Sequence, residues 1–304
     1  MYTKSELTAF PGDYLLTFPF VKLFGTNKWL ITIPHIIATV IGFYLLYLIC
    51  NKHLKNILAF TLVFAIVCFN YNLQLHAFEF RPYAVLPTLA LAVFILSERI
   101  VYDYDRLTRT KKALIGLFFV LTVAFHAYGI LMIFLCMSYF VLSKSDKKPI
   151  IEIIRKILPF SAALVLVSVP LFLWYYVQNN FSEGDFTSRN INTFDYIPNP
   201  LVNLNNFLRS VFGNLIGVKK LKLLINGVFV ALLIPQKDKL NQAKFLLFLI
   251  VLPIGLILLA DVRSGYWFVQ RQFVWVMPFF AFWLAWCWDS IFVFISEISY
   301  IKNL

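Results

Sequence analysis

Long apolar runs separated by short polar stretches dominate this chain, and they restrict its fold more than any other feature. A helix perpendicular to the membrane needs about 20 apolar residues to cross a bilayer. The longer runs are sufficient, and the shorter ones need interfacial aromatic residues or neighbouring helices at their ends. The pattern therefore predicts an all-α, polytopic transmembrane helix bundle. The runs occupy residues 29–50, 56–71, 82–96, 113–142, 157–177, 221–235, 245–260 and 273–295.

The run 113–142 is too long for one ordinary span. The tetrad His126-Ala127-Tyr128-Gly129 interrupts it, and we expect two short helices that turn at this tetrad. With this pair included, the sequence predicts about nine membrane segments.

Composition agrees with a bilayer environment. Of the 304 residues, 61% are hydrophobic and 14% are charged, and the mean hydropathy is +0.78. In water, helices of this composition would leave much apolar surface uncovered. The net charge of +12 does not indicate nucleic acid as a partner, because Lys and Arg lie in short loops where membrane topology and anionic headgroups account for them. The four cysteines lack the spacing of a disulfide framework or a zinc site.

The basic loops predict the orientation of the bundle. Five short stretches that would share one side of the membrane hold 16 of the 27 Lys and Arg residues. By the positive-inside rule this side is cytoplasmic, and the opposite side is external or periplasmic. The basic stretches are residues 51–55, 99–112, 144–156, 236–244 and 297–304. The external side then receives the N-terminal segment, residues 74–81, the turn at His126, and residues 178–220 and 261–272.

A polar cluster on the external side is the first candidate for function. The segment LQLHAFEFRPY, residues 73–83, places His76, Glu79 and Arg81 in a short break between two apolar runs. Ionisable groups at the edge of a bilayer are costly, so such a cluster indicates a functional site. A structural alternative stays open, because Glu79 and Arg81 are two residues apart and could pair with each other at the headgroup level. His76 also fits packing or the interface better than metal ligation.

Several short motifs occur in an order that resembles a known family. The chain is similar to the GT-C superfamily of integral-membrane glycosyltransferases, in the branch of protein-mannosyltransferase-like and aminoarabinose-transferase-like enzymes. The likeness extends from about residue 10 to residue 288. The motifs are Phe10-Pro11-Gly12-Asp13-Tyr14 followed by Lys22-Leu23-Phe24-Gly25, then Glu79-Phe80-Arg81-Pro82-Tyr83, His126-Ala127-Tyr128, and Arg271-Gln272-Phe273 before Pro278.

The resemblance implies transfer of a sugar from a polyprenyl-phosphate donor to a lipid, glycan or protein acceptor at the external face. It makes Glu79 and Arg81 the candidate catalytic residues, and Glu79 a candidate ligand for Mg²⁺ or Mn²⁺. Arg263 and Arg271 are candidates for binding the donor phosphate through their guanidinium groups, although both could instead anchor lipid headgroups. Four further side chains are expected to line the cavity of the site: Asp13, Tyr83, His126 and Tyr128.

One departure from the family concerns the N-terminus. The family's principal catalytic acid follows a first span and precedes the Pro-aromatic stretch, and this sequence has neither the span nor that acid. Asp13 lies inside the later motif and does not correspond to it. The predicted orientation also places Met1 outside. We therefore expect residues 1–28 to be the remnant of an external loop, with upstream sequence missing.

The rest of the chain divides into three parts on this interpretation. Residues 29–177 form the GT-C-like transmembrane core, and residues 221–304 form the C-terminal transmembrane helices. Between them, residues 178–220 form an external loop whose amphipathic stretch, about 201–215, is expected to lie on the membrane surface and help to admit the acceptor.

Two alternatives come from other functional classes. The first is a transporter or flippase of lipid-linked sugars, which would show internal repeats, matched discontinuous helices and charges near the middle of the membrane. The second is a non-catalytic relative that keeps the fold. In the leading interpretation the protein is multi-pass in a bacterial plasma membrane, with its site facing outside.

Overall fold

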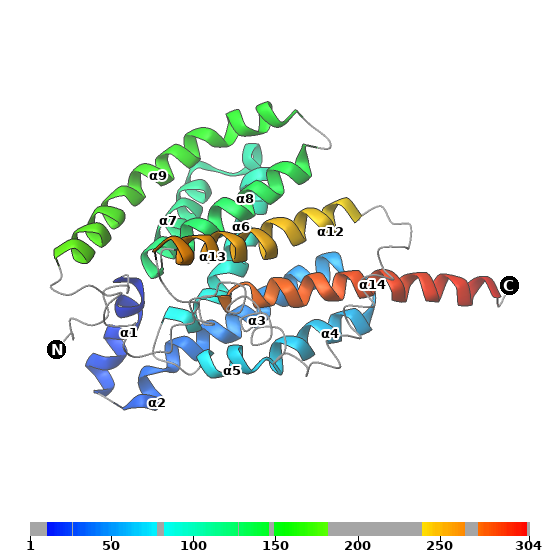
Figure 1. Ribbon diagram of the computed structural model, residues 1–304, viewed down its shortest axis with the longest axis horizontal. Helices are drawn as coiled ribbons and strands as arrows, with labels where there is room; N and C mark the ends of the chain where they lie inside the picture. The colour runs from blue at the N-terminus through cyan, green and yellow to red at the C-terminus, as the bar shows by residue number, and fades with distance from the viewer. Residues whose placement is uncertain are drawn as a thin grey trace.

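The computed structural model describes residues 11–25, 27–77, 82–126, 128–145, 149–181, 239–264 and 273–302, and all regular structure in these parts is helical (Figure 1). The amphipathic stretch predicted near 201–215 and the apolar run 221–235 lie outside them. The helices before the α7–α8 turn are α1 (Pro11–Phe24), α2 (Lys28–Ile31), α3 (Ile33–His53), α4 (Ile57–Cys68), α5 (Tyr71–Ala77), η1 (Pro82–Ala84), α6 (Leu86–Tyr102), η2 (Tyr104–Arg106) and α7 (Arg109–Phe125). Those after it are α8 (Tyr128–Lys144), α9 (Ile150–Phe181), α12 (Lys239–Leu246), the π-helix η3 (Leu247–Val251), α13 (Leu252–Ser264) and α14 (Met277–Lys302).

Three of the described helical stretches are long and apolar enough to cross a membrane: Trp29–His53, Lys239–Ile257 and Met277–Ser296. Helices α4 and α8 are apolar but shorter. The described part of the chain is therefore all-α, and its three candidate spans indicate a multi-pass membrane protein. The predicted break in the run 113–142 is confirmed, because α7 ends at Phe125 and α8 begins at Tyr128.

The segment 1–28, predicted as the remnant of an external loop, contains a helix in its described part. Residues Pro11–Phe24 form α1. Pro11 opens this helix, where a missing N–H is not needed, and Pro19 is tolerated inside it. Gly25 ends the helix with a positive φ of 64°, and its N–H donates to the Val21 carbonyl over 2.9 Å. This is the left-handed termination that glycine allows.

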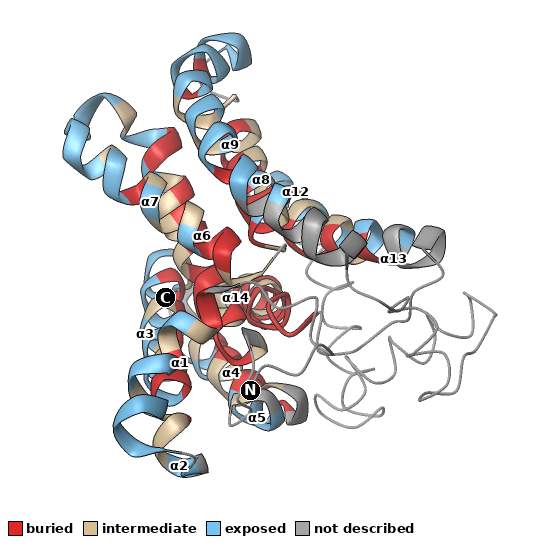
Figure 2. Cartoon of the chain, turned by 90° about the vertical axis from the view of Figure 1, so that its left-hand side faces the viewer, coloured by how far each residue is buried: buried red, intermediate tan, exposed pale blue. Residues whose placement is uncertain are grey.

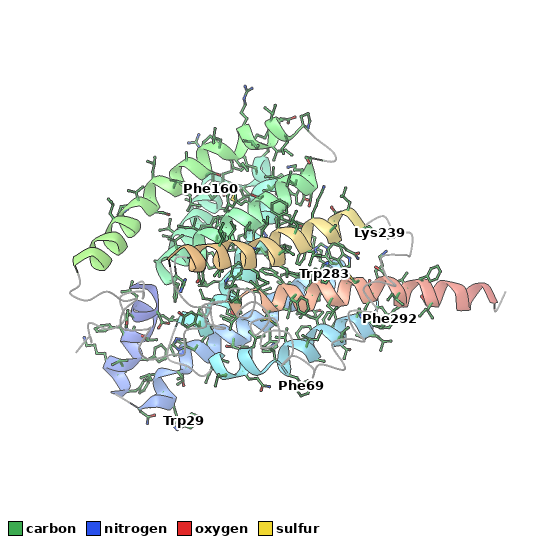
Figure 3. The ribbon with its side chains drawn as sticks, in the orientation of Figure 1. Trp29, Phe69, Phe160, Lys239, Trp283 and Phe292 are labelled. Atoms are coloured by element: carbon green, nitrogen blue, oxygen red, sulfur yellow. The ribbon has the colours of Figure 1, made fainter. Side chains whose placement is uncertain are left out.

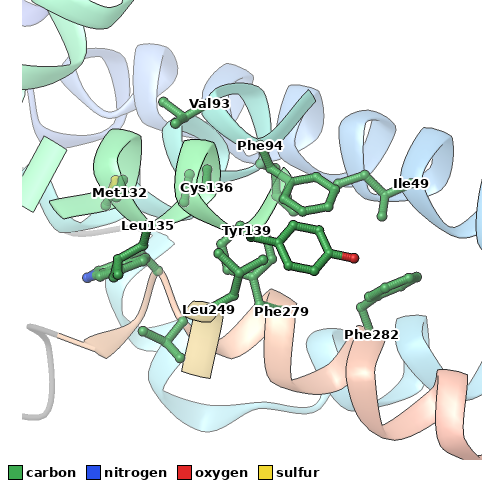
Figure 4. Close-up of a cluster of buried hydrophobic side chains, with 14 of the residues drawn as sticks. Ile49, Val93, Phe94, Met132, Leu135, Cys136, Tyr139, Leu249, Phe279 and Phe282 are labelled. Atoms are coloured by element: carbon green, nitrogen blue, oxygen red, sulfur yellow. The ribbon is translucent and has the colours of Figure 1, made fainter. Parts of the chain in front are cut away.

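The core lies between α6, α8, α14 and the α12–α13 stretch. Helix α6 packs against α8 and α3, while α14 packs against α4. Phe94 is at the centre, with ring centroids 4.7 Å from Phe140, 5.7 Å from Phe245 and 5.6 Å from Phe279 (Figure 4). Figure 2 shows buried residues along α14 and exposed residues on the outer faces of α2, α3, α7 and α9. Exposed apolar side chains on α3, such as Val40 and Tyr44, suit a helix that faces lipid.

Side-chain contacts join the basic stretches at one end of the bundle, which we call the basic end. They link the end of α3 to the end of α6, and the end of α8 both to α6 and to α12. They also link the start of α9 to η2, and α14 to the α3–α4 turn. The hydrogen bond between Lys156 Nζ and Asp105 Oδ2 lowers the pKa of this carboxyl and raises the pKa of the lysine. The contacts are Lys52–Glu98, Lys144 to the Val101 carbonyl, Lys244 to the Leu142 carbonyl (2.9 Å), Lys156–Asp105 (2.9 Å), and Asp289 with the N–H groups of Lys55 (3.1 Å) and Asn56 (2.7 Å).

The other end of the bundle, which we call the α1 end, holds α1, the start of α3, the end of α4, the start of α6 and the α7–α8 turn. Because successive helices alternate in direction, these segments are separated from the basic end by the length of the bundle (Figure 1). Four of the residues predicted to form the functional site belong to this end: Asp13, Tyr83, His126 and Tyr128.

Candidate functional site

A buried pair of ionisable side chains joins α1 to α3. Asp13, in the first turn of α1, is 4% exposed, and His35, in the first turn of α3, is fully buried. His35 Nε2 lies 3.0 Å from Asp13 Oδ1. An ionised carboxylate only accepts hydrogen bonds, so the imidazole is the donor in the state with an ionised Asp13 and a proton on Nε2. Of the acidic side chains that the structure describes, Asp13 is the one at the α1 end.

Close packing of α1 against the end of α7 keeps Asp13 in place. A Cβ atom added at Gly12 would lie only 2.8 Å from the Ala124 carbonyl oxygen and from Phe125, so the backbones approach to a distance that glycine alone permits. Within α1, Thr17 Oγ1 donates to the Asp13 carbonyl over 2.8 Å. The first turn of α1 is therefore fixed between α3 and α7.

Three aromatic residues meet beside the α7–α8 turn. The rings of His126 and Tyr128 are 4.3 Å apart, and those of Tyr83 and His126 are 5.7 Å apart. His126 Nδ1 accepts a hydrogen bond from the Tyr128 N–H over 3.2 Å, which leaves the ring proton on Nε2. Burial lowers the pKa of His126 to about 4, so this imidazole is neutral at physiological pH. The structure thus brings together three of the residues predicted to line the site.

A cavity of about 410 Å³ opens next to this aromatic group. Tyr83 lines it, whereas His126 reaches it only through its contact with the Tyr83 ring. Asp13 is also absent from the cavity wall, but its partner His35 lies one helical turn from Thr39, which lines the cavity. Helices α3, α4, α5 and α6 and the start of α14 supply the remaining walls.

The residues predicted to carry the chemistry are only partly placed. Glu79, Arg81 and Arg271 lie outside the described residues. Arg263 lies near the end of α13, with no description of its side chain. In the described parts of the chain, no three His, Cys, Asp or Glu residues group closely enough to hold a metal ion. The Mg²⁺ or Mn²⁺ predicted at Glu79 therefore stays a prediction.

His35 is the site residue that sequence reasoning missed. It stands within an apolar run, directly after Pro34, and nothing local distinguishes it from a packing residue. A signal was nevertheless present, because a histidine inside an apolar helix needs a polar partner. The candidates for that partner on the predicted external side included Asp13.

Comparison with protein-family models, with curated proteins and with solved structures finds no match to this chain.

Proposed function

We propose that this chain is a membrane glycosyltransferase of the GT-C kind, which transfers a sugar from a polyprenyl-phosphate donor to an acceptor at the external face of a bacterial plasma membrane. The observation that carries the proposal is the buried Asp13–His35 pair at the end of the bundle opposite the basic loops. A buried ionisable pair is costly to maintain. A carboxylate held by an imidazole is also an arrangement suited to proton transfer.

In the proposed reaction Asp13 takes the proton of the acceptor hydroxyl, and His35 orients the carboxylate. The acceptor oxygen forms a bond to the anomeric carbon of the sugar as its O–H bond breaks. The bond between that carbon and the phosphate oxygen breaks at the same time, and the electron pair leaves with the lipid phosphate. Arg263 and Arg271 are proposed to stabilise the departing phosphate, because their guanidinium groups stay charged and can bind it in bidentate fashion.

Glu79 and Arg81 keep their proposed catalytic roles; both shortly precede Tyr83 in the sequence, and Tyr83 lines the cavity. Glu79 is the proposed ligand if a divalent cation takes part, because carboxylate oxygen suits Mg²⁺ and Mn²⁺. Such an ion would supply positive charge for the leaving phosphate. Residues 29–177 are the proposed GT-C core, and the acceptor is a lipid, glycan or protein.

A transporter of lipid-linked sugars is the second candidate. The π-helix at Leu247–Val251 favours it, because this turn interrupts a candidate membrane span, and π-helical turns occur often at functional sites. Transporters built from repeats place such breaks in matched positions. Among the described helices η3 has no π-helical counterpart, and the glycosyltransferase is the better supported of the two.

The test is transfer of radiolabelled sugar from polyprenyl-phosphate donors by the purified protein, with any in-frame upstream sequence included. We expect transfer by the unchanged protein and its loss in Glu79→Gln and Arg81→Ala, while both variants still insert and fold. Asp105→Asn, at the basic end, is the control and should keep activity. A folded protein that transfers nothing from a broad panel of donors would favour the carrier or the non-catalytic alternative.

A further inference from the structure

We propose that the cavity at the α1 end binds the apolar chain of a membrane amphiphile. The cavity has a volume of about 410 Å³, which lies within the range of pockets that bind small ligands. This inference concerns binding alone and does not rest on the proposed reaction.

Three polar side chains in the cavity wall, those of Thr39, Gln74 and Thr88, already have hydrogen-bond partners within the protein. Thr88 Oγ1 donates to the Ala38 carbonyl over 2.7 Å, and Thr39 Oγ1 donates to the His35 carbonyl over 2.9 Å. Gln74 Nε2 donates to the Cys68 carbonyl. A sugar or an ion inside the cavity would lose hydrogen bonds to water and find few replacements. An apolar ligand has no such cost.

The depth of the cavity suits the end of a hydrocarbon chain. On α3 its wall runs from Thr39 to Leu46, and along η1 and α6 it runs from Ala84 to Leu91. Leu46 and Leu91 form the floor and are 1% and 2% exposed. Seven residues of α-helix give a depth of about 10 Å, or roughly eight carbons of an extended chain.

The mouth of the cavity lies beside a surface that faces lipid. Cys68 and Gln74 are the exposed residues in its wall. Val40 and Tyr44, on the neighbouring helix α3, are 63% and 60% exposed, and α3 belongs to a candidate membrane span. Phe69, which follows Cys68, is also exposed at the edge of the molecule (Figure 3). A chain from the bilayer can therefore enter beside the apolar face of α3, and its polar head stays in the water at the α1 end, where Cys68 is also exposed.

A second cavity, of about 800 Å³ between α8 and α9, does not support the same inference. Its walls include Phe134 and Val165, which are 63% and 64% exposed. It also has buried residues such as Val123 and Ile133 in its wall, but it lies apart from the cavity at the α1 end, between α8 and α9. It supplies a matched control position at Ser161.

Photolabelling of the full chain in phosphatidylcholine nanodiscs tests the proposal. The probes are dodecanoic acid and farnesyl phosphate, each with a diazirine at the end of its chain. Labelled residues are mapped by mass spectrometry. Tyr44 and Leu46 lie at similar depth on the same helix, and only a chain inside the cavity can reach Leu46. We expect label on Leu46 and Leu91 as well as on Tyr44, and the probe that labels Leu46 identifies the chain as unbranched or isoprenoid.

Two variants fill the cavity from different positions: Leu91→Trp at the floor and Ala77→Phe at the rim. Each should reduce the labelling of Leu46 to the level measured without light and leave the labelling of Tyr44 unchanged. Ser161→Phe, in the second cavity, should leave both unchanged. Label confined to exposed residues in the unchanged protein would overturn the proposal, and so would Leu46 labelling that persists in both filling variants.

Discussion

Asp13 and His35 lie 22 positions apart in the sequence and form a buried polar contact between α1 and α3. Removing a carboxylate from water costs several kcal/mol unless a partner compensates for the lost hydration. His35 is that partner, at 3.0 Å. Loss of either side chain would leave the other polar group buried with its remaining contacts alone.

We expect Asp13→Ala and His35→Ala each to lower the free energy of unfolding by about 3 kcal/mol, because each removes the partner across the buried α1–α3 contact. The double variant should lose less than the sum of the two single losses, because no orphaned partner remains. Thermal unfolding in detergent measures all three. As a control, Asp105→Ala removes an exposed ion pair with Lys156 and should cause no measurable change. Strictly additive losses would show that the two side chains do not stabilise each other.

The contact between α3 and α6 gives a second prediction at the level of a residue. A Cβ atom at Gly42 would clash with the Thr88 hydroxyl, which donates to the Ala38 carbonyl. Gly42→Ala should therefore destabilise the protein by about 1–3 kcal/mol through overpacking. Gly255→Ala has open space around it and should be neutral or slightly stabilising, because alanine favours helix. Equal melting temperatures for the two variants would contradict the packing described here.

At the level of elements, the sequence predicted those whose signals are local. The tetrad at 126–129 marked the turn between α7 and α8. Helix α1 itself was not predicted from the sequence. In the structure, the contact of Gly12 with α7 and the helix-initiating position of Pro11 favour a helix there. Such contacts are tertiary and leave no local pattern.

The sequence predicted part of the candidate site, namely its aromatic group, and missed the contact between Asp13 and His35. Tyr83, His126 and Tyr128 were expected together, and they meet at the α7–α8 turn. The partnership of Asp13 with His35 depends on how α1 docks against α3, which no spacing along the chain reveals. The predicted roles of Glu79, Arg81 and Arg271 fall on residues outside the described parts, so they stay predictions.

The α7–α8 turn should also make stability depend on pH. Burial lowers the pKa of His126 to about 4, below the value of about 6.5 expected in the unfolded chain. As pH falls from about 6.5 to 4, the unfolded chain takes up a proton that the folded protein excludes, and stability decreases. His126→Gln should remove about 2 kcal/mol of this decrease, since partial exposure of the ring reduces the full effect. Unfolding curves of the unchanged protein and of His126→Gln at pH 7 and pH 4.5 measure how much stability each loses. Equal losses in the two proteins would contradict a neutral, buried imidazole at His126.

For the whole molecule, the two ends of the bundle differ in chemistry. The basic end is joined by lysines that bind carboxylates and helix-terminal carbonyls, and by Asp289, which accepts hydrogen bonds from the N–H groups of Lys55 and Asn56. The α1 end has the buried acid–imidazole pair, the aromatic group and the cavity. Positive charge at one end orients a multi-pass protein with that end in the cytoplasm, so the α1 end is expected to face outside.

Cysteine labelling tests this orientation directly. Cys68 is exposed at the α1 end, and the other three cysteines, Cys50, Cys136 and Cys287, are buried. A membrane-impermeant maleimide should therefore label Cys68 in right-side-out vesicles and leave the Cys68→Ser variant unlabelled. Cys68→Ser combined with Asn51→Cys, which places a thiol at the basic end, should react only in inside-out vesicles. The reverse pattern would invert the bundle and place the candidate site in the cytoplasm.

The most direct test of the proposed function is the comparison of sugar transfer by the unchanged protein and by Asp13→Asn in proteoliposomes, with donor binding measured in parallel. We expect Asp13→Asn to keep its fold and its affinity for the polyprenyl-phosphate donor but to lose about 10²-fold or more in kcat, because an amide cannot take the acceptor proton. Transfer at an unchanged rate by a folded Asp13→Asn protein would contradict the role assigned to the buried pair.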